Sequence, residues 1–149
     1  MTKTEHASFT IDRVLAAPPA LVWSAWATRE GKDRWFATSD GLTLEKRAFD
    51  FRVGGTEIAT GRWTNGTVSE FEATYADIVP EKRIVYSYVM LINGTKISVS
   101  LATVEFSAEG VGTRLRITEQ GAFLDGYDDN GSREAGTREL VETLARSLA

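Results

Sequence analysis

The sequence predicts a single α+β domain in which an antiparallel sheet packs against a long C-terminal helix. Its 149 residues match the usual length of one domain, and we assign residues 1–149 to it. Residues 48–121 consist of strand-like segments separated by hairpin turns, which makes the predicted sheet antiparallel. In residues 133–149 apolar side chains recur at the spacing of one helix face, which predicts a long amphipathic helix.

The N-terminal part predicts one strand followed by two short helices. Ser8–Leu15 alternates apolar and polar side chains, as a half-buried strand does. Pro18 and Pro19 end this strand and open a helix, because proline suits the first helical turn. Residues 20–28 then carry apolar side chains at helical spacing, and a second short helix is expected at residues 30–36.

Turn residues divide the middle of the chain into about six further strands. Asn-Gly between apolar segments is the strongest short hairpin signal, because both central positions of the turn need positive φ. The predicted turns lie at residues 54–55, 65–66, 77–83, 93–94 and 110–112. With the first strand, the sheet therefore has about seven strands.

The composition removes several classes of chemistry. The chain has no cysteine, which excludes disulfides, thiolate nucleophiles and cysteine-ligated metals. Its one histidine, His6, lies near the N-terminus and leaves little material for histidine catalysis or zinc binding. The net charge of -4 and the scattered basic residues argue against nucleic acid as a partner. We expect no metal and no cofactor.

The N-terminal segment MTKTEHASF is polar and carries no secretory signal. No apolar run approaches the ~18 residues that span a membrane. We therefore expect a cytoplasmic protein without a membrane partner.

The segment Leu124–Glu134, LDGYDDNGSRE, concentrates acidic residues before the last helix. A calcium loop that starts at Asp128 is disfavoured, because Arg133 stands where the sharp turn needs glycine. A helix start explains the segment better, since Asn130 or Ser132 can cap the helix.

A curved sheet around one helix leaves space between the two unless large side chains fill it. The chain supplies many aromatic residues that either pack in the core or line a ligand pocket in that space. They include Trp23, Trp26, Trp35, Trp63, Tyr75, Tyr86 and Tyr88.

Four stretches of the chain resemble the START-like helix-grip superfamily, and in particular bacterial single-domain relatives of the C-terminal domain of the heat-shock-protein-90 ATPase activator. The stretches are AAPPALVWSAWAT (16–28), RWF (34–36), FDFRVGGTE (49–57), and DIVPEKRIVYSY (77–88) followed by GVGTRLRITEQGAF (110–123). The resemblance covers residues 8–148. It implies a seven-stranded sheet that grips the last helix, with a mainly apolar pocket between them.

The sequence departs from the pattern of these relatives at three places. Gly136-Thr137 stands where many members carry Gly-Trp, which leaves room near the pocket mouth. Glu119 replaces a histidine that is common after the final strand. Glu57, Ala59 and Gly61 replace phenylalanines, and period-two alternation places all three on one face. The resemblance thus implies a roomier pocket that contains one or two carboxylates.

Glu119 is the candidate catalytic residue. It shares the inner face of its strand with Leu115 and Ile117, and a half-buried carboxylate can act as a general acid or base. The alternative is a structural ion pair with an arginine, namely Arg13, Arg62 or Arg138. Glu57 is a similar candidate.

The loop before the last helix carries three apolar residues, Phe123, Leu124 and Tyr127. In helix-grip folds this loop borders the pocket entrance, so the resemblance implies a lid that the loop glycines let move. The alternative is that these side chains pack into the core.

We therefore expect a protein that binds a small apolar, aromatic or lipid-like molecule between the sheet and the last helix. The alternatives are an enzyme of the polyketide cyclase or hydrolase type that uses Glu119 or a tyrosine, and an interaction module that activates a chaperone ATPase. A homodimer is also left open. The predicted pocket residues are Trp26, Trp35, Glu57, Trp63, Tyr75, Tyr86, Tyr88, Glu119, Phe123, Leu124, Tyr127, Thr137, Leu140, Val141 and Leu144.

Overall fold

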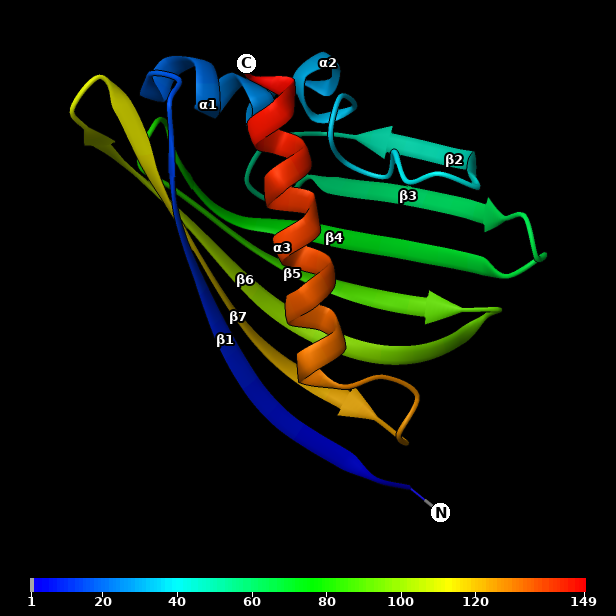
Figure 1. Ribbon diagram of the computed structural model, residues 1–149. Helices are drawn as coiled ribbons and strands as arrows, with labels where there is room; N and C mark the ends of the chain where they lie inside the picture. The colour runs from blue at the N-terminus through cyan, green and yellow to red at the C-terminus, as the bar shows by residue number, and fades with distance from the viewer. Residues whose placement is uncertain (1) are drawn as a thin grey trace.

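The computed structural model describes residues 2–149 as a curved sheet with one long helix across its concave face (Figure 1). Two short helices lie beside the C-terminal end of the long helix. The elements in chain order are β1 (Thr4–Leu15), α1 (Pro19–Ala27), α2 (Arg29–Lys32), β2 (Leu42–Phe49), β3 (Thr56–Trp63), β4 (Val68–Val79), β5 (Arg83–Ile92), β6 (Thr95–Glu109), β7 (Gly112–Leu124) and α3 (Asn130–Ser147).

The seven strands form one antiparallel sheet in the order β1-β7-β6-β5-β4-β3-β2. Strands β2 to β7 follow one another as hairpins, whereas β1 pairs with β7 along its whole length, from Thr4 opposite Leu124 to Leu15 opposite Thr113. Strands β1 and β2 are the two edges. The α+β prediction is therefore confirmed: the sheet is antiparallel, the last helix is long, and two short helices follow the first strand.

All five predicted turns connect neighbouring strands. Asn93 and Gly94 have φ angles of 50° and 79°, which is the geometry that favours Asn-Gly there. The turn between β2 and β3 uses two glycines differently. Gly54 has a φ of 83° and open space around it, whereas Gly55 packs against the backbone carbonyl of Asp50.

Three element boundaries differ from the prediction. Strand β1 begins at Thr4 rather than Ser8, because pairing with β7 continues through exposed residues that show no alternation. Helix α2 ends at Lys32 rather than at residue 36, and the chain continues as turns to Ala37, where φ is 58°. Strand β2 begins at residue 42 instead of 48, since a bulge between residues 44 and 46 breaks its alternation.

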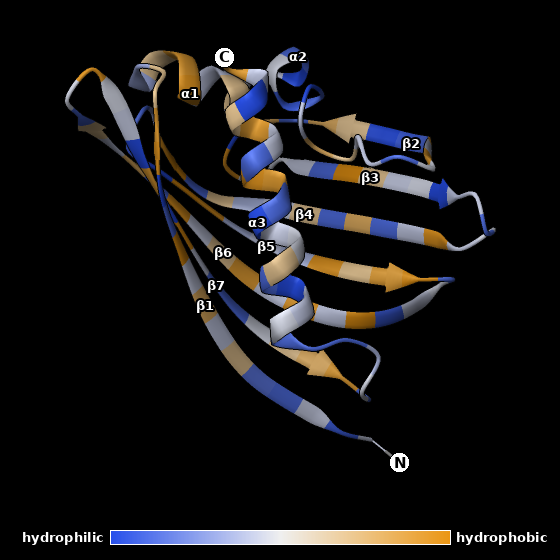
Figure 2. Cartoon of the chain, in the orientation of Figure 1, coloured by the Kyte–Doolittle hydropathy of each residue, from blue (hydrophilic) through white to orange (hydrophobic). Residues whose placement is uncertain are grey.

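The core lies between the sheet and the three helices. Along the strands, apolar and polar residues alternate, so that one face of the sheet meets the helices and the other meets solvent (Figure 2). Val141 and Leu144 are the buried side chains of α3, and Val22, Ala25 and Trp26 are those of α1. Burial of these apolar surfaces stabilises the docking of both helices.

Helix α3 is capped by Asp129, whose carboxylate accepts from the backbone N–H of Ser132 (2.8 Å). The prediction that Asn130 or Ser132 caps the helix was therefore wrong by one and three residues. Both are inside α3, because the residue with extended backbone just before the helix is Asp129.

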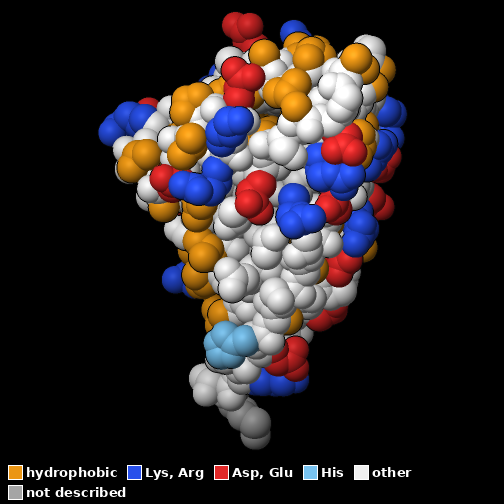
Figure 3. All heavy atoms as spheres, turned by 90° about the vertical axis from the view of Figure 1, so that its left-hand side faces the viewer, with side chains coloured by type: hydrophobic (Ala, Val, Ile, Leu, Met, Phe, Trp, Pro, Cys, Tyr) orange, Lys and Arg blue, Asp and Glu red, His pale blue; other side chains and the backbone are white. Residues whose placement is uncertain are grey.

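The outer face of the sheet is mixed: it exposes Val14, Val99 and Leu101, and it carries ion pairs. Asp12 of β1 contacts both Arg114 and Arg116 of β7, and acidic and basic side chains lie next to one another on this side of the molecule (Figure 3). Such exposed pairs contribute little stability individually. In residues 2–149, every helix is too short or too polar to cross a membrane.

Candidate functional site

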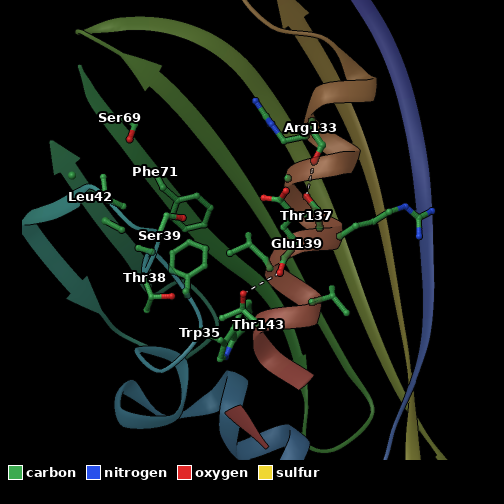
Figure 4. Close-up of a pocket in the computed structure, with 18 of the residues that line it drawn as sticks. Trp35, Thr38, Ser39, Leu42, Ser69, Phe71, Arg133, Thr137, Glu139 and Thr143 are labelled. Atoms are coloured by element: carbon green, nitrogen blue, oxygen red, sulfur yellow. Dashed lines mark hydrogen bonds between the residues drawn. The ribbon is translucent and has the colours of Figure 1, made fainter. Parts of the chain in front are cut away.

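A cavity of about 1020 Å³ lies between α3 and the inner face of the sheet. Strands β2 to β5 and β7, together with the segment that follows α2, supply the wall opposite α3. Figure 4 shows Leu42, Ser69 and Phe71 on this wall, and Thr137 and Glu139 of α3 across from them. The cavity is therefore built where the sheet curves away from the helix.

The structure places nine of the predicted pocket residues on the cavity wall. They are Trp26, Trp35, Trp63, Tyr86, Tyr88, Glu119, Thr137, Leu140 and Val141. Ala59 and Gly61 also line it, on the same face of β3 as Glu57, as their alternation predicted. The space beside Gly61 is filled, however: a Cβ there would lie 2.4 Å from Leu42 Cδ1. Only at Ala59 does the small side chain widen the cavity.

The other six predicted residues do not line the cavity. Tyr75, Leu144 and Glu57 are buried in the protein, as is Phe123, whereas Leu124 is half-buried and Tyr127 is 60% exposed. The loop does not form the expected apolar lid. The backbone N–H of Asp125 donates to the Lys3 carbonyl, and the backbone N–H of Lys3 donates to the Asp125 carboxylate, which ties the loop to the start of β1. Asp125 and Gly126 both have positive φ angles. Of the three apolar loop residues, Phe123 is the one that packs into the core, as the alternative prediction stated.

Glu57 is the centre of a buried ionic cluster at the α2 end of the cavity. Its Oε1 accepts from Lys32 Nζ (2.7 Å) and Tyr75 Oη (2.5 Å), and its Oε2 accepts from Arg47 Nη1 (2.9 Å). Arg47 also donates to Asp33 (3.0 Å). The two cations and two carboxylates balance, and the cluster ties α2 to β2 and β3.

Lys32 is the member of this cluster that lines the cavity. Its ammonium lies 4.6 Å from the centre of the Phe36 ring and within 6 Å of four more aromatic rings. Burial lowers the pKa of Lys32, and the charge of Glu57 opposes this shift. Burial likewise raises the pKa of Tyr75, so its hydroxyl stays protonated and donates to Glu57.

Glu119 forms a second polar cluster at the other end of the cavity. Its Oε1 accepts from Tyr88 Oη (2.5 Å), which in turn accepts from Arg133 Nη1 (3.0 Å). Arg133 Nη2 donates to Ser98 (2.8 Å) and to Asp128 (2.9 Å). Arg133 thereby joins the start of α3 to β5, β6 and the preceding turn. The cluster is suited to recognising a polar group of a bound molecule.

Sequence reasoning missed Lys32, Arg47 and Arg133. The three arginines considered as partners of Glu119 pair elsewhere: Arg13 with Glu142, Arg62 with Glu45 and Arg138 with Glu134. A signal for Arg133 exists, because it precedes Thr137, Leu140 and Val141 at helical spacing on the stripe that faces the sheet. The sequence contains no such signal for Arg47, because the bulge in β2 breaks the alternation that would indicate which face of the strand its side chain occupies.

Comparison with known proteins shows the family. The family model of activator of Hsp90 ATPase homolog 1-like proteins matches residues 16–149. The chain belongs to this family. Its sheet, its C-terminal helix and the two short helices are those of the START-like helix-grip fold that its motifs resemble.

Two solved structures resemble this family member closely. An uncharacterized protein from Rhizobium leguminosarum is 44% identical, with a TM-score of 0.95 over 99% of this chain and 97% of that one. The Mll3558 protein from Rhizobium loti is also 44% identical, with a TM-score of 0.91 over 98% and 99% of the two chains. An AHSA1-like protein from Aeromonas hydrophila, 22% identical, shares the fold with a TM-score of 0.71 over 95% and 91%. Curated proteins give no significant match.

In this family member Gly136 and Thr137 line the cavity, and Thr137 stands where the resemblance implies a tryptophan in many relatives. A Cβ on Gly136 would meet no atom within 4 Å. The mouth of the cavity is therefore open at this point of α3.

Replacement of Glu119 by glutamine is expected to change how the stability of this family member depends on pH. Burial raises the pKa of Glu119, while the Tyr88 hydrogen bond and the charge of Arg133 offset part of that shift. A carboxyl whose pKa is raised on folding stabilises the protein at acidic pH, and this contribution is lost as pH rises through the folded pKa.

The free energy of unfolding of the Glu119→Gln variant, relative to wild type, should therefore rise as the pH is raised from about 4, near the unfolded pKa of glutamate. Urea denaturation at several pH values measures it. Glu142→Gln, which changes an exposed carboxylate of α3, is the control. A relative stability that falls with pH would contradict the raised pKa of Glu119.

Proposed function

We propose that this protein binds a small molecule with an apolar or aromatic body in the cavity between α3 and the sheet. The cavity carries the proposal. Its volume of about 1020 Å³ is in the range of small-molecule sites, and its wall combines aromatic rings with a few polar groups. Binding without chemistry is favoured, because the chain offers no cysteine and has its single histidine in β1, away from this wall.

Native mass spectrometry of the freshly purified protein, followed by solvent extraction, tests this function directly. A stoichiometric small molecule would support it and reveal the chemical class of the ligand. A clean mass of the free protein, together with failure to bind any apolar probe, would favour a protein partner instead, as the family name suggests for other members.

Gly136→Trp is expected to weaken binding of a naphthyl probe such as 2-(1-naphthyl)ethanol by about tenfold or more. The reason is steric, since position 136 lines the cavity and has free space in front of its Cα. The variant should fold, because a helical glycine is the least favourable residue there after proline.

Gly136→Ala is the matched control for this prediction. It gains more helix propensity than tryptophan does but adds only one methyl group, so probe affinity should stay within about threefold of wild type. Isothermal titration calorimetry measures both variants. Equal affinity of Gly136→Trp and Gly136→Ala would place the probe outside the cavity.

Catalysis is a second candidate, because Glu119 presents a buried carboxylate to the cavity beside a tyrosine hydroxyl. Once a ligand is identified, Glu119→Gln separates the two functions. Lost turnover with retained binding would support chemistry on the ligand, whereas unchanged behaviour would exclude a catalytic role of Glu119.

A further inference from the structure

The charged side chains on the cavity wall are not evenly balanced. Four are basic and five are acidic. Three of the basic residues form ion pairs with carboxylates: Lys32 with Glu57, Arg133 with Asp128 and Arg138 with Glu134. The acidic residue Glu142 pairs with Arg13, which does not line the cavity. Within residues 2–149, four wall residues form no ion pair: Arg146, Asp40, Glu119 and Glu139. The unpaired residues on the wall therefore carry more negative than positive charge.

Glu119 is the one buried member of this unpaired group, with 5% of its surface exposed. Tyr88 donates to its Oε1, and no hydrogen bond from residues 2–149 reaches its Oε2. The nearby guanidinium of Arg133 bonds to Tyr88 Oη rather than to the carboxylate, and Asp128 offsets its charge. Oε2 is not one of the fully buried polar atoms, so this oxygen of a largely buried carboxylate stays accessible to a positive or hydrogen-bond-donating group of a ligand.

The surroundings of Glu119 favour a positive group. Tyr88 stacks at an angle on Phe71 (5.1 Å between ring centres) and on Tyr86 (6.0 Å), and all three rings line the cavity. Aromatic faces attract cations, and more strongly where water is excluded. Asp40 and Glu139 add unpaired negative charge to the wall, the latter from α3 in Figure 4.

An anionic group finds fewer partners here. Both terminal nitrogens of Arg133 already donate hydrogen bonds, to Tyr88, Ser98 and Asp128. Lys32 is committed to Glu57 at the opposite end of the cavity. Of the four basic residues on the wall, the exposed Arg146 remains, and it lies near the C-terminal end of α3 whereas Arg133 lies near its start.

We propose that the ligand carries a protonated amine on its apolar body and that this amine pairs with Glu119 Oε2. The inference rests on the proposed function, since it names the chemical class of the molecule that occupies the same cavity. The ammonium donates to Oε2 and packs against the ring of Phe71, because the guanidinium of Arg133 already lies 5.6 Å from the centre of the Tyr88 ring. The apolar body extends along the wall toward Trp35.

Three probes of nearly equal shape test the charge of the ligand. They are 2-(1-naphthyl)ethylamine, 2-(1-naphthyl)ethanol and 1-naphthylacetate, which are cationic, neutral and anionic at neutral pH. Isothermal titration calorimetry with the wild-type protein should rank the amine about tenfold or more tighter than the alcohol, with the acetate weakest. This ranking needs no variant and is decisive by itself.

Glu119→Gln then locates the amine. The substitution should weaken binding of the amine by about tenfold or more and change the affinity for the alcohol by less than about threefold, because it removes the charge of the side chain and keeps its shape. Glu72→Gln, which removes an exposed carboxylate of β4 outside the cavity wall, should change binding of the amine by less than about threefold.

The outcomes separate the inference from the function on which it rests. If the alcohol binds as tightly as the amine, or the acetate more tightly, the amine proposal is overturned and the binding function stands. If Glu119→Gln leaves the amine affinity unchanged, the proposed contact is overturned. If none of the three probes binds up to its solubility limit, both proposals are overturned for ligands of this size.

Discussion

Replacement of Glu57 by glutamine is expected to lower the free energy of unfolding by about 3–5 kcal/mol. The glutamine keeps the shape of the side chain but removes the charge that two buried cations share. Lys32 is 2% exposed; within residues 2–149 its ammonium hydrogen-bonds to Glu57 alone, and five aromatic rings have their centres within 6 Å of it. Arg47 retains Asp33, so most of the loss arises from Lys32.

Urea denaturation followed by tryptophan fluorescence measures this loss. The matched rescue is the double variant Lys32→Met/Glu57→Gln, which removes the stranded ammonium along with the carboxylate. It should be more stable than Glu57→Gln alone, as buried ion pairs can be replaced by apolar groups at little cost. A loss below about 1 kcal/mol in the single variant would mean that water already screens the cluster.

Replacement of Gly55 by alanine is expected to cost about 3 kcal/mol of stability, the upper end for overpacking. A Cβ at this position would lie 2.1 Å from the carbonyl oxygen of Asp50 and 3.0 Å from that of Arg52. Both are backbone atoms of the tight β2–β3 turn. The carbonyl of Gly55 also accepts from the backbone N–H of Tyr75 (3.0 Å), so the turn cannot move without disturbing β4.

Gly54→Ala is the control within the same turn. Its Cβ would meet nothing within 4 Å, and only the positive φ of 83° opposes the substitution. The expected cost is about 1–2 kcal/mol. Thermal unfolding of both variants compares them, and a Gly54→Ala protein that is less stable than Gly55→Ala would contradict the steric explanation.

The fold could be predicted because its signals are local. Asn93-Gly94 specifies a turn through its own backbone preference, and the alternation in β7 correctly placed Leu115, Ile117 and Glu119 on the buried face. Such features need no knowledge of distant parts of the chain. The family motifs repeat the same information, since they consist mostly of turn and core residues.

The polar clusters could not be predicted in the same way, because their members meet only in the folded chain. Lys32 and Glu57 are 25 residues apart, and nothing near either residue specifies the other. Tyr88 and Arg133 are 45 residues apart, and their contact depends on how α3 crosses the sheet. Side-chain facing follows from periodicity, whereas pairing across elements follows from tertiary packing.

The pairing of β1 with β7 sets the order in which the protein can assemble during synthesis. Strand β1 is the first to leave the ribosome, but its partner begins at Gly112. At ordinary translation rates of about 5–20 residues per second, β1 therefore waits on the order of ten seconds with its apolar face uncovered. The polar residues that alternate with Phe9 and Ile11, namely Ser8, Thr10 and the charged Asp12, oppose association of this segment with other nascent chains.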